Sequence, residues 1–190
     1  APATAVRPHG PWPPEFTGQG HHAGTTLIPD RHDPVVPASQ TVLAAREAAE
    51  RAGCVATVGR INVEPGGTNV IASAATIWLD CRAEEPQTVT TVVEEIQQAS
   101  KTAADKQGCQ VVWTRESWTV RTAFDLRARM LQILGEDVPQ LSTGAGHDAA
   151  TLATTIPTGM LFVRNPSGAS HCPAESASDA VFDAGPEARP

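Results

Sequence analysis

The chain has 190 residues and a formal net charge of −7, which suits one ordinary domain or two small ones. The acidic balance argues against a nucleic acid or an anionic membrane as the main partner, because both attract clustered cations. No apolar run reaches the roughly 18 residues of a membrane-spanning helix. At 41% hydrophobic and 18% charged residues, the composition is that of a folded protein.

The first residues are rich in proline: five of the sixteen prolines lie in residues 1–16. Proline has no backbone N–H and a fixed φ, so we expect residues 1–14 to form a tail or a poor edge strand. The four cysteines form no C-x-x-C pair, and we expect buried thiols. No charged-then-apolar leader is visible, so the expected location is the cytoplasm.

The middle of the chain has the patterns of two helices and four strands. Residues 34–52 are predicted as a helix, because Asp33 suits its N-cap and Gly53 follows its last residue. The other predicted elements are, in order, a weak strand near Phe16, strands at 55–64 and 69–81 around a Pro-Gly-Gly turn, a helix at 86–107 and a strand at 109–119. This β-α-β-β-α-β order predicts a ferredoxin-like α+β domain over residues 15–119.

The last third of the chain has a different pattern, which we read as part of an α/β domain over residues 120–190. A helix at 124–134, a glycine-rich turn at 142–146 and a short helix at 147–154 come first. An apolar stretch at 159–163 is then predicted as a buried parallel strand. The end, from residue 183 on, is polar and closed by proline.

Two clusters in the first part of the chain could carry chemistry. His22 precedes Ala23 and Gly24, and this small-residue turn could let the imidazole donate to a developing oxyanion. Asn69 and Arg82 flank the predicted strand 69–81, and a guanidinium suits a bidentate grip on a substrate carboxylate. The alternatives are a solvated turn for His22 and a surface ion pair with a nearby acidic residue for Arg82.

Two further clusters lie in the second part. Gly144, Gly146 and His147 form a glycine turn at a helix start, where backbone N–H groups can bind an anion. Alternatively, Asp148 only caps that helix and His147 is an ordinary turn residue. His171 follows the predicted strand 159–163, a place where α/β enzymes often hold a metal, although one histidine cannot bind zinc by itself.

Taken in order, these segments resemble the metal-dependent amidohydrolases and peptidases of the aminoacylase and carboxypeptidase type. The matching motifs are H-A-G-T-T…R-H-D (22–33), V-A-T-V-G-R-I-N-V-E-P-G-G-T-N-V-I (55–71), L-D-C-R (79–82), S-T-G-A-G-H-D-A (142–149) and P-T-G-M-L-F-V…G-A-S-H-C-P-A-E (157–175). The branch it resembles most is N-carbamoyl-L-amino-acid hydrolase, allantoate amidohydrolase and β-ureidopropionase.

The resemblance implies a ferredoxin-like lid over residues 15–119, which also forms a homodimer and can serve the partner's active site. It implies that His22 polarises the scissile carbonyl and that Asn69 and Arg82 hold the carboxylate of a small-molecule substrate. Residues 120–190 would be the closing part of the catalytic domain. There the turn of Gly144, Gly146 and His147 would line the pocket.

The resemblance also implies that His171 binds a divalent metal, which would be zinc, manganese, cobalt or nickel, with two ions in the complete enzyme. The reaction implied is hydrolysis of the C–N bond of an N-carbamoyl-L-amino acid or related ureido acid. The family's other metal ligands and its glutamate base belong to an upstream half that would precede residue 1. We therefore expect the isolated chain to be inactive. The alternative is a non-catalytic dimerisation or ligand-binding module derived from that family.

Overall fold

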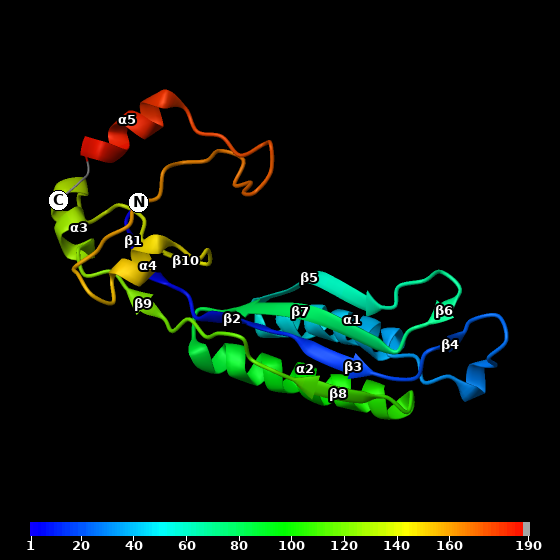
Figure 1. Cartoon of the computed structure of the whole chain (residues 1–190). Coiled ribbons are helices and arrows are strands. Elements are labelled where there is room, and N and C mark those ends of the chain that lie inside the picture. Colours follow the sequence, from blue (N-terminus) through cyan, green and yellow to red (C-terminus); the bar gives the residue numbers. More distant parts are fainter. Residues whose placement is uncertain (188–190) are drawn as a thin grey trace. The chain divides into compact units, whose positions relative to one another are not determined.

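A computed structural model describes residues 1–187, and the chain divides into two compact units (Figure 1). The central unit comprises Pro8–Val120. The terminal unit comprises Ala1–Arg7 together with the chain from Arg121 onward. The first seven residues therefore fold with the end of the chain and not with the residues that follow them.

The central unit contains two long helices, one five-stranded antiparallel sheet and a separate two-stranded ribbon. Its elements are β2 (His9–Trp12), β3 (Pro14–Thr17), β4 (His21–His22), a 3-10 turn η1 (Ile28–Asp30), α1 (Val35–Ala52), β5 (Val55–Glu64), β6 (Val70–Ile71), β7 (Ala74–Arg82), α2 (Pro86–Lys106) and β8 (Gln110–Trp113). Strand β7 pairs with β5 on one side, and with β2 and β3 in succession on the other. Strand β8 closes the sheet by pairing with β3.

This order, β5-β7-β2/β3-β8, confirms the predicted ferredoxin-like arrangement. The hairpin prediction is also confirmed, because β5 and β7 pair antiparallel from Val55↔Arg82 to Glu64↔Ala74. The segment predicted as one strand over 69–81 is divided into β6 and β7. Strand β6 leaves the main sheet and pairs with β4 in a separate two-stranded ribbon.

Both helices of the central unit cover the same face of the sheet (Figure 1). Strand β7 shows the consequence, because Ile77, Leu79 and Cys81 are buried while the alternate residues are only half-buried. Helix α1 contributes small residues to this core and helix α2 contributes valine and isoleucine. Aromatic side chains that could fill a wide core are scarce. The small residues of α1 instead let the helix approach the sheet closely, which keeps the core densely packed.

Helix α1 ends where predicted but begins one residue late, at Val35, with Pro34 and not Asp33 at its N-cap. The Asp33 carboxylate accepts a hydrogen bond from the Val35 N–H at 3.0 Å. Gly53 follows the last helical residue with φ 63°, in the left-handed region that glycine adopts without strain. Helix α2 starts with Pro86 and ends at Lys106, one residue earlier than predicted.

Residues 1–14 do not form the tail that the prolines suggested, since they contain β1 (Ala3–Val6) and β2. Pro11 lies within β2 and takes part in the ladder as an acceptor, its carbonyl receiving the Glu116 N–H at 3.3 Å. Pro13 falls in the one-residue gap between β2 and β3. The prediction was wrong because a proline breaks only those pairings that need its own N–H.

The terminal unit is built around strand β1. Its other elements are β9 (Thr122–Ala123), α3 (Arg127–Leu134), β10 (Leu141–Thr143), α4 (Asp148–Leu152) and α5 (Asp179–Glu187). Strand β1 is the middle strand of three, parallel to β10 and antiparallel to β9. Four buried apolar residues of this unit form one core cluster, Ala3, Val6, Phe124 and Ala149, and Ala5 and Met130 are buried as well.

One prediction for this unit was wrong. Residues 159–163 are not a buried parallel strand. They pair with the chain start through an antiparallel bridge, Pro2↔Leu161, and a hydrogen bond from Phe162 N to Ala1 O at 2.8 Å. The polar end contains helix α5, which begins at Asp179. The last part of that predicted end, residues 188–190, lies outside the described residues.

Candidate functional site

His22 and Asn69, which are 47 positions apart in the sequence, lie close together at one end of the central unit: His22 is in β4, and Asn69 is the turn residue directly before β6. In the β4–β6 ribbon, His22 is opposite Val70. The next pairing joins the Ala23 N–H to the Asn69 carbonyl at 2.9 Å. Because the ribbon depends on pairing between distant segments, the sequence could nominate both residues but not their proximity. We call this ribbon and the turn that follows it, residues 21–31 with 69–71, the tip.

The ring of His22 is held in one orientation by its own turn. The Gly24 N–H donates to His22 Nδ1 at 3.0 Å. Nδ1 is therefore an acceptor, so in the neutral ring the proton resides on Nε2. A Cβ at Gly24 would lie 3.1 Å from His22 Cε1, so glycine lets the ring come this close to the backbone. His22 is exposed, and its Nε2–H is available as a donor.

Arg31 also belongs to the tip. It is part of the motif at residues 22–33, but nothing in the sequence predicted a role for it. Its guanidinium donates from Nη2 to the Ala23 carbonyl at 2.7 Å, and from Nε and Nη2 to the Thr26 carbonyl at 3.1 and 3.0 Å. The signal was present in the motif H-A-G-T-T…R-H-D, where an arginine follows the turn at a fixed spacing. Nothing in that spacing showed that the arginine folds back over the turn.

Arg82 lies at the opposite end of the sheet from the tip. It is the last residue of β7 and forms a bidentate pair with Asp80, from Nε to Oδ1 at 2.5 Å and from Nη2 to Oδ2 at 3.0 Å. Strand β7 starts at Ala74, and eight residue steps at about 3.3 Å each put roughly 26 Å between its ends. The structure therefore does not bring Arg82 to His22 and Asn69 within one central unit.

The three candidates of the glycine turn lie together in the terminal unit. Gly144 and Gly146 precede His147, which is exposed and is the N-cap of α4. His147 Nδ1 accepts the Ala149 N–H at 3.0 Å. The predicted alternative, a cap by Asp148, is wrong, because the histidine ring supplies the cap. His147 and His22 thus use the same device: Nδ1 is bonded to a backbone N–H two residues on, and Nε2 carries the proton.

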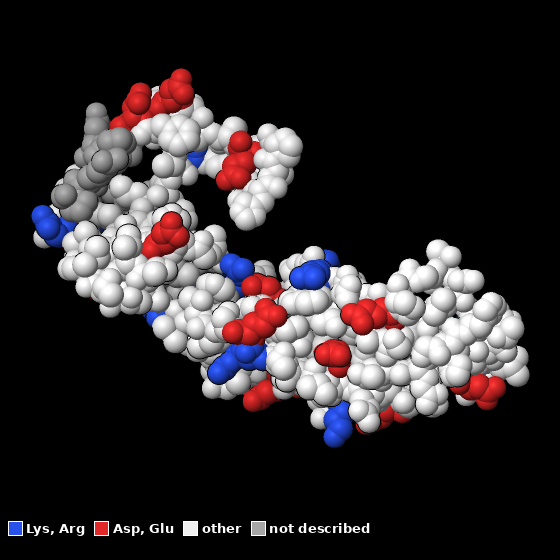
Figure 2. Space-filling model, in the orientation of Figure 1, with Lys and Arg blue, Asp and Glu red and all other residues white. Residues whose placement is uncertain are grey.

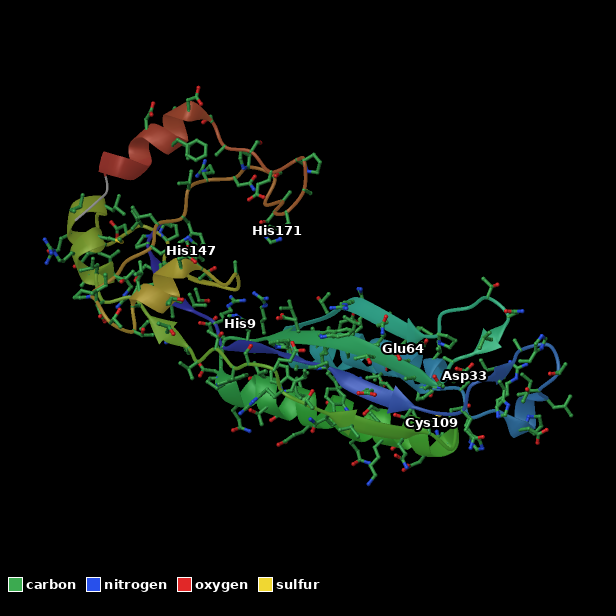
Figure 3. The ribbon with its side chains drawn as sticks, in the orientation of Figure 1. His9, Asp33, Glu64, Cys109, His147 and His171 are labelled. Carbon is green, nitrogen blue, oxygen red and sulfur yellow. The ribbon has the colours of Figure 1, made fainter. Side chains whose placement is uncertain are left out.

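His171 lies on a separate exposed loop of the terminal unit (Figure 3). Its backbone is in the left-handed region with φ 56°, and its N–H donates to Glu175 Oε2 at 2.9 Å. Within residues 1–187, no three His, Cys, Asp or Glu side chains are grouped as a metal site. The described residues therefore do not by themselves fit the divalent metal that the resemblance implies, and His171 remains one predicted ligand.

The open face of the central sheet carries polar contacts that sequence reasoning missed. The Arg60 guanidinium lies 4.1 Å from the centre of the Trp78 ring, and Trp78 Nε1 donates to Glu116 Oε1 at 3.2 Å. Basic and acidic groups are interspersed on the side of this unit visible in Figure 2. The burial pattern of a single strand marks which residues face outward, but not which of them meet across strands.

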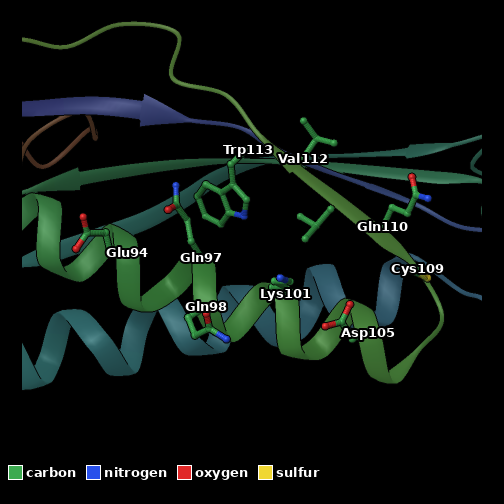
Figure 4. A pocket seen from close by; sticks show the side chains of 10 residues that line it. Glu94, Gln97, Gln98, Lys101, Asp105, Cys109, Gln110, Val112 and Trp113 are labelled. Carbon is green, nitrogen blue, oxygen red and sulfur yellow. The ribbon is translucent and has the colours of Figure 1, made fainter.

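A groove of about 580 Å³ lies between α2 and the edge strand β8 (Figure 4). Its walls combine polar side chains, such as Gln97, Lys101 and Gln110, with the apolar side chains of β8, including Trp113. None of the predicted site residues lines it. The candidate chemistry therefore lies outside this groove, at the tip, at Arg82 and in the loops of the terminal unit.

Comparison with known proteins gives the same assignment as the motifs. Residues 15–107 match the family described as a peptidase dimerisation domain. The N-carbamoyl-L-amino acid amidohydrolase of Geobacillus stearothermophilus is 35% identical over 169 residues, which cover 84% of this chain and 41% of the relative. The allantoate amidohydrolase of Escherichia coli K12 is 28% identical over 168 residues, with 84% and 41% covered.

The fold comparison agrees. The crystal structure of an amidase of the hydantoinase/carbamoylase family from Burkholderia vietnamiensis matches with a TM-score of 0.89 and 28% identity, covering 98% of this chain and 47% of that one. The chain thus spans about 41% of the length of the curated relatives it matches. Among the helices of the described residues, none has both the length and the apolar character to cross a membrane.

Proposed function

Because this chain belongs to the family of amidohydrolases and peptidases that share the dimerisation domain of residues 15–107, we propose that it serves as the lid and C-terminal part of a dimeric amidohydrolase. The proposed reaction is hydrolysis of a linear C–N bond in an N-carbamoyl-L-amino acid or a related ureido acid. The observation that carries the proposal is the tip, where His22 is oriented as a donor beside Asn69.

The chemistry proposed for His22 follows from its ring. Attack on a carbamoyl carbon moves negative charge onto the carbonyl oxygen, and a donor aimed at that oxygen stabilises the transition state more than the substrate. Since Gly24 occupies Nδ1, the Nε2–H is the group that meets the oxygen. The metal of such enzymes would supply an activated water, and the residues for that step are outside the role proposed for this tip.

Arg82 is proposed to hold the carboxylate of the substrate. Its fork is already pre-shaped by the bidentate contact with Asp80, and a guanidinium that is fixed in orientation loses less entropy on binding a carboxylate. Asp80 would then hold the Nε–Nη2 edge of the guanidinium, while the Nη1–Nη2 edge would meet the substrate carboxylate. Asn69 would add an amide contact to a substrate from the tip.

The distance between Arg82 and the two tip residues, His22 and Asn69, suggests a role for the partner subunit of the homodimer. A carbamoyl amino acid is only a few ångströms long and cannot touch both ends of a nine-residue strand. We therefore propose that the two ends of each lid serve different active sites. Arg82 would act in one site of the homodimer, while His22 and Asn69 would reach the site of the partner subunit.

The tip has the surface that such a contact needs. Leu27 and Ile28, in and beside the 3-10 turn η1, are 70% and 74% exposed. Val70, directly across the ribbon from His22, is 38% exposed. Apolar side chains clustered around polar functional groups are typical of a surface that is covered by another chain.

Subunit mixing tests the proposal. A complete enzyme is made by replacing the matching part of the Geobacillus relative with residues 8–120 of this chain. It is assayed with N-carbamoyl-L-amino acids, allantoate and N-carbamoyl-β-alanine. We expect the His22→Ala and Arg82→Ala dimers each to lose at least about 100-fold in kcat/KM, because each loses a contact to the transition state or to a charged group. After subunits are exchanged, about a quarter of the unsubstituted activity should return, because half of the dimers are mixed and each has one intact site.

A matched control uses the other residue of the tip. Mixing His22→Ala with Asn69→Ala subunits should restore nothing, since both residues belong to the same end of the lid. Absence of recovery between His22→Ala and Arg82→Ala, with mixed dimers verified by mass spectrometry, would place all three residues in one site. An unsubstituted chimera that dimerises but hydrolyses none of the substrates would favour the alternative, a non-catalytic dimerisation or ligand-binding module.

A further inference from the structure

Three backbone carbonyls of the turn that carries His22 accept hydrogen bonds from other groups of the tip. Two of them, those of Ala23 and Thr26, accept from Arg31. The third, that of His22 itself, accepts from Thr26 Oγ1 at 3.0 Å and from the Thr26 N–H at 3.2 Å. The guanidinium therefore fastens both ends of the four-residue turn, and Thr26 connects that contact to the backbone of His22.

The guanidinium of Arg31 is linked to Asn69 through the backbone groups of Ala23. Ala23 gives its carbonyl to Arg31 and its N–H to the Asn69 carbonyl. A planar group with fixed donor directions suits two carbonyls at a set separation better than an ammonium does. Arg31 therefore bridges the two residues of the tip that the proposed function assigns to substrate, although it lies in neither strand of the ribbon.

Arg31 is itself attached to the body of the central unit. The Arg31 N–H closes η1 by donating to the Ile28 carbonyl at 3.3 Å. The next residue, His32, contacts the Gln107 carbonyl through Nδ1 at 3.1 Å, and its own carbonyl accepts the Gln19 N–H at 2.9 Å. The turn is thus tied to the end of α2 through Arg31 and His32, and not only through its two short strands.

We propose that Arg31 is a positioning residue: it holds the turn so that the Gly24 N–H stays on His22 Nδ1 and the Nε2–H points outward. The proposal rests on the donor role assigned to His22 in the proposed function. Without Arg31, the Ala23 and Thr26 carbonyls turn to water, the Gly24 N–H leaves the ring, and the proton of the neutral imidazole distributes between both nitrogens.

The test reads the tautomer of His22 directly in this chain. Long-range ¹H–¹⁵N spectra of the imidazole rings are recorded at a pH where the rings are neutral, and the His22 signals are assigned by their loss in His22→Asn. The unsubstituted chain should show the Nε2–H form. In Arg31→Ala we expect the ratio of the Nε2–H to the Nδ1–H form to fall about fivefold, the factor that loss of one typical hydrogen bond produces. Arg31→Lys should fall between the two.

The control is Arg46→Ala, which removes an exposed arginine of α1 that forms an ion pair with Glu50, one helical turn further on. It should leave the His22 signals unchanged. Amide spectra of β5 and β7 report whether each variant keeps its fold. Thr26→Val serves as a second variant, because it removes the hydroxyl bond to the His22 carbonyl. It should shift the ratio of the two His22 tautomers in the same direction as Arg31→Ala.

The outcomes separate the two proposals. An unchanged tautomer ratio in folded Arg31→Ala or Arg31→Lys overturns the role of Arg31 and leaves the proposed function standing. A mixture of both tautomers in the unsubstituted chain overturns the donor orientation of His22, on which both proposals depend. An unchanged tautomer ratio in Arg31→Ala together with a loss of activity in the chimeric enzyme would also overturn the positioning role of Arg31, because Arg31 would then act on the reaction by another route.

Discussion

The two units of this chain differ in the size of their apolar cores. The central unit has two clusters of buried apolar residues beneath one sheet. The terminal unit has one cluster of four buried residues. Both units leave large apolar side chains more than half exposed, such as Leu43 and Ile61 in the central unit and Ile156 and Phe182 in the terminal unit, so the difference lies in the core and not at the surface.

The two units also differ in how they hold the candidate site residues. His22, Asn69 and Arg82 are on strands or on a turn closed by several hydrogen bonds. His147 and His171 are exposed, and their hydrogen bonds join them to neighbours within four residues. The central unit thus places its candidate groups through pairings between distant segments, whereas these two groups of the terminal unit are held by local bonds.

Deleting residues 1–7 gives the largest effect expected from this comparison. The deletion removes β1, the middle strand between β9 and β10, and with it two of the four residues in the core cluster of the terminal unit. Neither remaining strand has another partner in that three-stranded sheet, so the terminal unit should lose its fold. Amide hydrogen exchange should show complete loss of protection in β10 and unchanged protection in β7. Protection retained in β10 would contradict the comparison.

Thiol labelling sharpens the comparison without changing the backbone. Cys172 is exposed on a loop of the terminal unit, whereas Cys81 is 0% exposed in the central core. Burial, together with nearby Cys54, raises the pKa of Cys81 to about 12, so little thiolate is present at pH 8. We expect Cys172 to react at least about 1,000-fold faster than Cys81, which needs an opening of the core. Mass spectrometry of peptides measures both rates, with Cys172→Ser as the control, and comparable rates would show that the central core opens readily.

Matched leucine substitutions compare the two units energetically. Leu79 is 0% exposed in β7, and Leu141 is 53% exposed in β10. Leu79→Ala should lower the free energy of unfolding by about 2–5 kcal/mol, through lost burial and the cavity left behind. Leu141→Ala should change it by less than about 0.5 kcal/mol, as surface substitutions usually do. Urea denaturation measures both: tryptophan fluorescence reports the central unit, which holds all four tryptophans, and amide hydrogen exchange of β10 reports the terminal unit. A larger loss for Leu141 would mean that β10 is covered in solution.

The central fold was predictable because its signals are local. Asp33 and Gly53 at the ends of α1, the turn between β5 and β7, and the alternation within β7 each fix one element. What could not be predicted depends on pairings between distant residues. The strand β2, with Pro11 inside it, exists because it pairs with β7, and no local pattern shows that distant partner.

The site follows the same division. His22, Asn69 and Arg82 could be nominated from their residue types and from the order of the motifs. The ribbon that joins His22 to Asn69, and the return of Arg31 over its turn, depend on which backbone groups meet in space. The strand predicted at 159–163 failed for a related reason, because its partner is the start of the chain, 160 residues away, and not a neighbouring β-α-β unit.

The smallest expected effect concerns pH and is again confined to the central unit. The pKa of Cys81 lies at about 12 in the folded protein, against 9.0 for an ordinary thiol, chiefly because burial disfavours the thiolate. The folded state therefore binds this proton more tightly than the unfolded state, so the contribution to stability is complete below pH 9 and is lost as the pH rises toward 12. Between pH 9 and 10 the unsubstituted chain should lose up to about 1 kcal/mol more in the free energy of unfolding than Cys81→Ala does. Urea titrations at the two pH values measure the difference, and Cys172→Ala, which changes an exposed thiol, should behave like the unsubstituted chain. Equal pH dependence for Cys81→Ala and the unsubstituted chain would mean that Cys81 reaches water in the folded state, and the contrast between the two units would then be weaker than their burial indicates.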